Sequence, residues 1–218
     1  MFSLVCEELL SALNREQLLE QIKFHYNEMT QMPEPLHNLA LEYYNKYLII
    51  GGMPAVVNNY IETNSFLSIK DIQGKILNEY IADMSKYATP STSVKIRSCY
   101  NSIPTQLAKE NNKFQYKVVQ KGGSSTIFGE AIDWLLSAGI VLKTQRLENA
   151  FIPIKAYQDF GDFKLYMNDV GMLTMHSDIP FQLLQSSLLQ DNTFLGSVAE
   201  NYVAQAFAIN RIPLFYWK

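Results

Sequence analysis

Apolar side chains recur three and four positions apart in the first part of the chain, which is the spacing of one face of an α-helix. Such patterns run over 18–29, 36–47 and 66–84. Glycine and proline separate them, because Gly51 and Gly52 can take the positive φ that ends a helix and Pro54 suits the first turn of the next one. Residues 1–88 are therefore predicted to form an all-helical bundle.

The pattern changes after residue 88, where helices give way to β-type runs. Helical spacing covers 94–101, a short stretch from Ser102 to Asn111, and 127–138. The segments 140–147 and 151–157 then predict a β-hairpin, and 163–167 predicts a further strand. Three helices followed by a hairpin is the order of a winged helix, which we predict for 89–178.

The last part, 179–218, holds one helical pattern around 194–209 and an aromatic segment, 213–217, that predicts a strand. Because the sequence stops one residue later, we expect this strand to be cut off from its sheet, at the truncated start of an α/β domain. The predicted fold class is mainly α with a small β component: a helical bundle, a winged-helix domain and the beginning of that α/β domain.

Composition narrows the class of protein. Hydrophobic residues make up 48% and charged residues 18%, which excludes disorder, collagen and a disulfide scaffold. Cys6 and Cys99 lack a CxxC spacing and are predicted to be buried free thiols. We expect no signal peptide, because the first residues lack a basic segment and a long apolar run, and no apolar run reaches the roughly 20 residues that a membrane span requires. We therefore expect a cytoplasmic protein without a membrane partner.

Charge is unevenly distributed. Residues 1–85 carry five basic and eleven acidic side chains, 86–121 carry seven and one, and 122–218 carry six and nine. The middle segment thus has a balance of +6 between two acidic blocks, and a basic island on a winged helix predicts phosphate contacts. The candidate nucleic-acid residues are Lys109, Lys113, Lys117, Lys121, Lys143 and Arg146.

These cations have a second interpretation as ordinary solvated residues. Glu130 and Asp133 put negative charge on the presumed recognition helix, whose polar face offers only Ser125 and Thr126 for base edges. Packing between domains is therefore an alternative role for this region.

No catalytic constellation is evident. The glycine-rich run 122–126 lacks the lysine of a phosphate loop, and neither HExxH nor GxSxG occurs. Asp162, Phe163 and Lys164 imitate the D/E-x-K triplet of metal-dependent nucleases, but these residue types are ordinary on the exposed face of an edge strand. We expect no enzyme activity, no catalytic residue and no cofactor in this chain.

Four ordered segments nevertheless resemble one family. They are YLIIGGMPAVV at 47–57, SIPTQLAKENNKF at 102–114, AIDWL at 131–135 and FKLYMNDVGML at 163–173. They are similar to the uncharacterised C-terminal region that follows a P-loop AAA-type ATPase domain in many bacterial and archaeal proteins. In those proteins the order is ATPase core, helical lid, winged helix and restriction-endonuclease-like domain.

The resemblance implies that 1–88 is lid-like and that 179–218 begins a nuclease-like domain. It further implies a non-catalytic regulatory and interaction region that couples a nucleotide-binding core to a C-terminal effector domain. Its partners are then the ATPase core and C-terminal domain of the same protein, and ATP and Mg²⁺ are cofactors of the full-length family only. The competing hypothesis is a DNA-binding module that uses 86–121. Exposed apolar surface would also favour a homo-oligomer.

Individual residues carry two of these implications. Gly52, Met53 and Pro54 resemble the GxP motif of the lid, in which the proline packs near the adenine of a nucleotide bound by the full protein. The alternative for the same three residues is a helix end followed by a proline at the first position of the next helix. Glu200 resembles a glutamate of the nuclease metal site, whose other ligands would follow Lys218. One carboxylate cannot hold Mg²⁺ in a catalytic geometry, so nuclease activity is expected to be absent, and a solvated position on the helix face is the alternative for Glu200.

Overall fold

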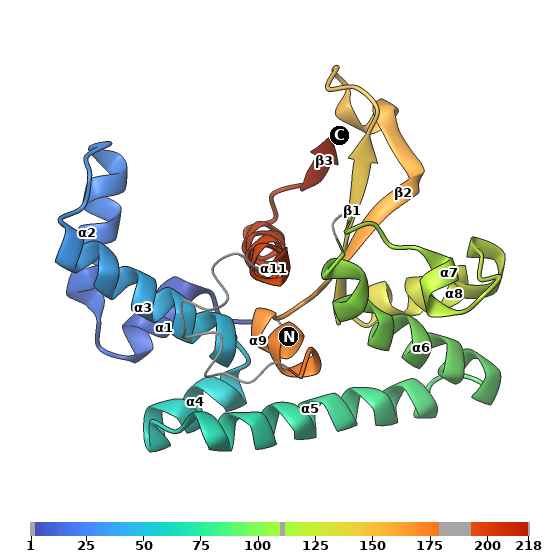
Figure 1. Ribbon diagram of the computed structural model, residues 1–218, viewed down its shortest axis with the longest axis horizontal. Coiled ribbons are helices and arrows are strands. Elements are labelled where there is room, and N and C mark those ends of the chain that lie inside the picture. The colour runs from blue at the N-terminus through green and yellow to red at the C-terminus, as the bar shows by residue number, and fades with distance from the viewer. Residues whose placement is uncertain (1–2, 110–111, 179–192, 218) are drawn as a thin grey trace.

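The computed structural model describes residues 3–109, 112–178 and 193–217, which form mainly helices and one small sheet (Figure 1). This agrees with the predicted class, mainly α with a small β component. The first helices are α1 (Cys6–Ala12), α2 (Glu16–Asn27), α3 (Glu34–Ile50), α4 (Pro54–Thr63) and α5 (Phe66–Lys86). The later elements are α6 (Pro90–Leu107), α7 (Tyr116–Val119), α8 (Ser125–Ser137), β1 (Val141–Leu147), the 3₁₀-helix η1 (Ile154–Tyr157), β2 (Gln158–Met167), α9 (Val170–His176), α11 (Thr193–Ile209) and β3 (Phe215–Trp217).

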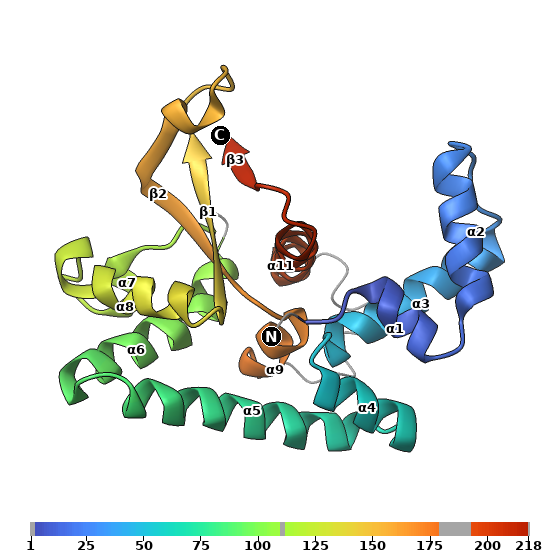
Figure 2. The same cartoon turned by 180° about the vertical axis from the view of Figure 1, so that it is seen from behind.

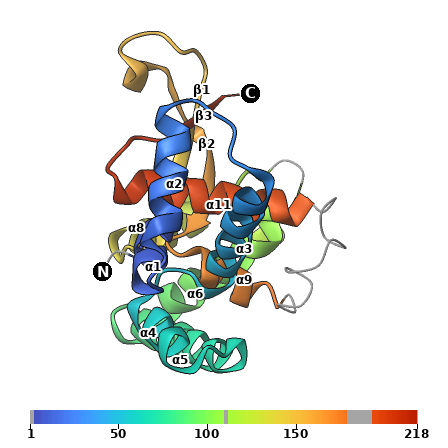
Figure 3. The ribbon, with the colours of Figure 1, turned by 90° about the vertical axis from the view of Figure 1, so that its left-hand side faces the viewer.

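The helices are arranged around α11, which lies in the middle of the molecule (Figure 1). α2 and α3 form an arm at one end, α5 runs along the base, and α6, α7 and α8 lie at the opposite end, as the view from behind also shows (Figure 2). Seen from the arm, α11 crosses behind α2, and the sheet projects beyond it (Figure 3). The elements that follow the arm thus enclose α11 from several sides.

Glycine and proline set the helix ends of the first part as predicted. Gly51 has a φ of 70° and ends α3, and Pro54 is the first residue of α4. Asn64, with a φ of 46°, ends α4 in the left-handed conformation. The helical assignment of this part is therefore confirmed.

The predicted break at Ser102 is wrong, because α6 continues from Pro90 to Leu107 through Pro104. A proline inside a helix removes one backbone hydrogen bond and disfavours the turn before it. Here Ile103, Pro104 and Leu107 are all buried. Their packing into the core holds the last turn of α6 against the local preference of proline.

The second strand of the hairpin also differs from the prediction. β1 pairs antiparallel with β2, from Val141 opposite Met167 to Leu147 opposite Gln158. The predicted strand 151–157 is instead a connection that contains η1. A register shift between Gln145 and Arg146 marks an irregularity of the β-bulge type, which bends the strand.

The aromatic strand β3 joins this same sheet, contrary to the prediction that it is separated from its partner strands. It runs parallel to β1, with Gln145 opposite Phe215 and Leu147 opposite Trp217. The strand order is β2-β1-β3. β1 is therefore the central strand, and β2 and β3 are the two edges.

One large hydrophobic core connects most elements. It contains, among others, Tyr47 of α3, Ile69 of α5, Tyr100 of α6, Leu135 of α8, Tyr166 of β2 and Val198 of α11. A smaller cluster of Leu10, Leu18 and Tyr43 holds the arm together. Because the large core takes side chains from helices and sheet alike, it fixes their relative positions.

Two expectations from composition are also testable in the structure. Cys6 and Cys99 are free thiols, Cys99 buried and Cys6 half-buried. Within the described parts of the chain, no helix combines the length and the apolar character that a membrane span requires.

Candidate functional site

Met53 and Pro54 lie at the start of α4 and line a pocket of about 560 Å³. The turn from α8 into β1, at Gly139 and Ile140, lines the same pocket, and Tyr80 of α5 contributes a phenol. None of the described lining residues is charged, and most of the exposed lining is apolar. This size and polarity are typical of sites that accept an uncharged group.

Asp169 lies between β2 and α9 and is fully buried. Its carboxylate accepts hydrogen bonds from the backbone N–H groups of Gly52, at 2.7 Å, and Met172, at 3.0 Å, and from the hydroxyl of Ser3. The bond from Met172 caps the N-terminus of α9, and the bond from Gly52 fixes the connection between α3 and α4. One carboxylate therefore joins three segments that are far apart in the sequence.

Glycines allow the backbones around Asp169 to approach closely. A Cβ added at Gly52 would lie 1.9 Å from the carbonyl oxygen of Leu4. A Cβ added at Gly171 would lie 2.6 Å from the backbone nitrogen of Gly51. Both distances are below 3.0 Å, and Cβ atoms in proteins essentially never lie that close to another heavy atom. The crossing of the end of α3 with the start of α9 thus requires glycine.

The bond between Gly52 and Asp169 joins the end of α3 to the start of α9, and we call this contact the junction. Two side-chain amides connect the junction to α11. Gln205 accepts from the N–H of Val170 at 2.9 Å and donates to the hydroxyl of Tyr47 at 2.8 Å. Asn201, one turn earlier, accepts from the N–H of Met167 at 2.8 Å and donates to its carbonyl at 3.1 Å. Because both amides are buried, these bonds are shielded from water. They hold α11 against α3, the end of β2 and the start of α9.

Burial raises the pKa of Asp169 above its ordinary value, and the hydrogen bonds from Ser3, Gly52 and Met172 oppose that rise. The partners of this carboxylate among the described residues are all donors supplied by the fold itself. A buried carboxylate that is engaged in this way acts as a structural anchor, since removing a donor would leave an acceptor without its bond.

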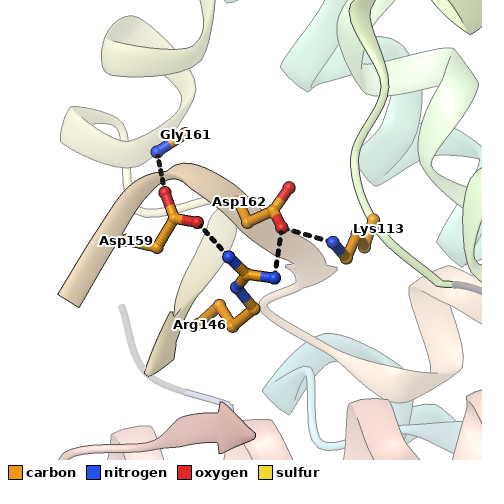
Figure 4. A network of polar contacts seen from close by, with 5 residues as sticks. All are labelled: Lys113, Arg146, Asp159, Gly161 and Asp162. Carbon is orange, nitrogen blue, oxygen red and sulfur yellow. Dashed lines mark hydrogen bonds and ion pairs between the residues drawn. The ribbon is translucent and has the colours of Figure 1, made fainter. Parts of the chain in front are cut away.

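A second polar network lies at the irregular position of the hairpin (Figure 4). Asp162 forms ion pairs with Lys113 and, at 3.1 Å, with Arg146. Arg146 also contacts Asp159 at 2.5 Å, and Asp159 accepts the N–H of Gly161 at 2.9 Å. The bond from Gly161 is the main cause that lowers the pKa of Asp159, and Arg146 adds to it. The network ties the segment before α7 to the bend in β2.

Glu200 lies on α11 and faces β2. Its Oε1 accepts from Lys164 and from the hydroxyl of Tyr166, at 2.8 Å, and its Oε2 accepts from the side-chain amide of Asn112, at 2.8 Å. Burial alone would raise the pKa of Glu200, but these three hydrogen bonds lower it. Glu200 is therefore an ionised carboxylate with both oxygens engaged, and its environment differs from that of a solvated helix-face residue.

The two carboxylates nearest to a nuclease pattern are already neutralised by cations of the chain. Asp162 is paired with Lys113 and Arg146, and Glu200 is paired with Lys164, the lysine of the D-x-K triplet. Across 3–109, 112–178 and 193–217, no three His, Cys, Asp or Glu side chains are grouped so that they could hold a metal ion. The geometry gives Mg²⁺ no open set of ligands in these parts of the chain.

The six cations predicted to contact nucleic acid have different environments. Lys113 and Arg146 belong to the network around Asp162. Lys143 places its ammonium 4.4 Å from the centre of the Phe163 ring. The remaining three are exposed and form no ion pair with any other described residue: Lys109, Lys117 and Lys121.

The residues around the bond between Gly52 and Asp169 carry almost no signal in the sequence. Asp169 stands directly before a helix, which is the one local signal for an N-cap. Its burial and its bond to Gly52, 117 positions away, leave no trace in the neighbouring sequence. Gln205 is equally inconspicuous, because a single glutamine in a helical pattern usually indicates a solvated position.

The amino-acid sequence matches one protein family. No curated protein and no solved structure matches the chain. The family model described as Domain of unknown function (DUF8612) matches residues 41–182, which is more than half of the 218 residues. The matched segment includes Gly52, Pro54, the hairpin and Asp169. This chain therefore belongs to the DUF8612 family.

Proposed function

We propose that this chain is a non-catalytic regulatory and interaction region of a larger AAA-type ATPase, in which it couples a nucleotide-binding core to an effector domain. The observation that carries the proposal is the 2.7 Å hydrogen bond from the N–H of Gly52 to the buried carboxylate of Asp169. It ties the segment that resembles the lid GxP motif to the helix that directly follows the hairpin. In this proposal α6–α8 with β1 and β2 are a winged-helix-like unit, and α11 with β3 begins a nuclease-like unit.

The coupling would start at the pocket beside α4. Met53 and Pro54 are the residues that would face the nucleotide-binding core, which supplies ATP and Mg²⁺. A shift of Pro54 would also displace Gly52, which lies two positions earlier. Separating Gly52 from Asp169 costs about 1–3 kcal/mol, because a buried acceptor is left unsatisfied. Movement of α9 together with Gly52 avoids that cost, and Gln205 then passes the movement to α11.

ATP hydrolysis by the whole natural protein that contains this sequence tests the proposal. We expect the purified protein to hydrolyse ATP and the Asp169→Asn variant to change the rate severalfold, because an amide cannot accept all three hydrogen bonds. Asp133→Asn is the matched control, since it makes the same substitution at an exposed position on α8. A whole protein without ATPase activity, or a rate that both variants leave unchanged, would contradict the proposal.

DNA binding by the winged-helix-like unit is the second candidate function. It is favoured by the exposed lysines Lys117 and Lys121 next to the turn before α8, with Lys109 close to them in sequence. Binding should weaken with salt, by a slope of about 0.9 per phosphate contact in logarithmic units. Replacing these three lysines by glutamate should remove it, whereas glutamate at Lys70, Lys75 and Lys155 is the matched control. A fluorescent duplex that stays unbound at low salt would exclude this candidate.

A further inference from the structure

The two ends of the molecule carry opposite charge and exposed apolar side chains. The arm with α2 lies at one end of the long dimension, and the corner between α5 and α6 lies towards the other (Figures 1 and 2). α2, from Glu16 to Asn27, belongs to the acidic segment 1–85, and the basic segment 86–121 starts at this corner. The two surfaces therefore cannot meet within one molecule.

The surface on the arm is a stripe along α2. Glu20, Phe24 and Glu28 follow one another at intervals of four positions, so they share a face of the helix, and we call them the acidic stripe. All three are exposed, and Phe24 exposes 55% of its surface. Neither glutamate has an ion-pair partner within the described chain. Tyr26 and Met29, which are 82% and 95% exposed, extend the apolar area.

The surface at the other end combines lysines with apolar side chains. We call it the basic corner, and it consists of Lys86, Tyr87, Val94 and Lys95. Tyr87 and Val94 are 65% and 62% exposed, and the ammonium of Lys86 lies 4.9 Å from the centre of the Tyr87 ring. In the part of the chain that the structure describes, neither lysine forms an ion pair. Asp83 opposes them one turn earlier, and Arg97 adds a further cation.

We infer that a second copy of this chain docks its acidic stripe onto the basic corner. The two surfaces match in charge, and each places an exposed aromatic ring between or beside its charged groups. A phosphate backbone would complement the lysines but not the exposed apolar surface of Tyr87 and Val94, so a protein partner fits this corner better. A contact between two different surfaces of the same chain repeats from copy to copy and forms a closed ring or an open chain of molecules.

Sedimentation velocity over a range of protein concentrations tests this inference. At about 50 mM salt the weight-average sedimentation coefficient is expected to rise with concentration, and at about 500 mM it should return to the monomer value, because salt screens exposed charges. The double variant Glu20→Lys, Glu28→Lys has two basic ends and should remain monomeric. The double variant Lys86→Glu, Lys95→Glu has two acidic ends and should also remain monomeric.

Mixing the two variants provides the decisive readout. In the mixture every stripe again meets a corner of opposite charge on the other variant, so association should return. Controls with the same change of net charge away from both surfaces are Glu62→Lys with Glu148→Lys, and Lys70→Glu with Lys155→Glu. These controls should associate like the unmodified chain, and circular dichroism shows that each variant is folded.

Several results would overturn the inference. An unmodified chain that stays monomeric at low salt would do so, as would association that persists in both variants or is insensitive to salt. A mixture of the folded variants that stays monomeric would exclude the head-to-tail contact specifically. Duplex DNA that binds the basic corner of a monomeric chain would assign this surface to nucleic acid instead.

Discussion

Replacing Gly171 by alanine tests the close crossing of α3 and α9. In most helices a glycine-to-alanine change stabilises by about 0.5–1 kcal/mol, because alanine loses less backbone entropy on folding. At Gly171 the new methyl group would lie 2.6 Å from both the backbone nitrogen of Gly51 and the carbonyl oxygen of Ile50. Backbone atoms cannot rotate away as a flexible side chain can, so we expect the sign of the effect to reverse.

The magnitude follows from the distance that α9 must move. Ordinary contacts begin at 3.4 Å, so the crossing has to open by about 0.8 Å. Overpacking of this kind costs about 1–3 kcal/mol, and stretching the bond from Gly52 leaves the buried Asp169 acceptor partly unsatisfied, which costs part of about 1–3 kcal/mol. We expect a loss of about 3 kcal/mol in the free energy of unfolding, which lowers Tm by about 6–12 °C in a chain of this length.

Urea unfolding followed by circular dichroism measures this loss, with three other helical glycines as controls. A Cβ added at Gly74, Gly129 or Gly196 has no atom within 4 Å. Alanine at these positions should therefore leave the protein unchanged or stabilise it by up to about 1 kcal/mol. If Gly171→Ala were as stable as the unmodified chain while the controls behaved as expected, the close crossing would be refuted.

Three further results are expected. The pKa of Glu200 is lowered from 4.5 in the folded state, so its stabilising contribution is complete above that value and is lost as the pH falls through the folded pKa. The urea midpoint should therefore drop more between about pH 5 and about pH 3 in the unmodified chain than in the Glu200→Gln variant. Equal drops would argue against a carboxylate whose two oxygens are engaged. The side chain of Thr89 caps α6 by accepting a hydrogen bond from the N–H of Thr92. Thr89→Ala should therefore lower the free energy of unfolding in urea by about 1 kcal/mol. An unchanged urea midpoint would show that the cap does not stabilise the protein. Millimolar Mg²⁺ should leave Tm unchanged, because Asp162 and Glu200 are already paired with cations, whereas a rise in Tm would reveal a metal site.

Local sequence signals predicted the fold where short-range preferences decide it. The positive φ of Gly51 and the N1 position of Pro54 followed from residue type alone. The same rules failed at Pro104, because burial of Ile103 and Leu107 outweighs the helix-breaking tendency of proline. They also misplaced the second hairpin strand, since pairing with β1 selects 158–167 over the apolar run 151–157.

The candidate site shows a similar division. Gly52 and Pro54 stood out in the sequence, but Asp169, which holds Gly52, is brought to it only by tertiary packing. Lys113 and Arg146 were grouped with the other cations because charge counts ignore pairing. The structure places Asp162 between them, a contact that joins positions 49 residues apart in the case of Lys113. Long-range pairing of this kind leaves no local pattern to read.

Amide hydrogen exchange at Gly52 and Val170 would show most directly whether the segment at Gly52 and α9 move as one body. The N–H of Gly52 is bonded to Asp169, and the N–H of Val170 is bonded to Gln205, so both are protected by the same junction. Rigid coupling predicts that both amides exchange through one opening, with free energies that agree within about 1 kcal/mol, and that Asp169→Asn lowers both together. A Gly52 amide that exchanges far more readily than that of Val170 would contradict the coupling.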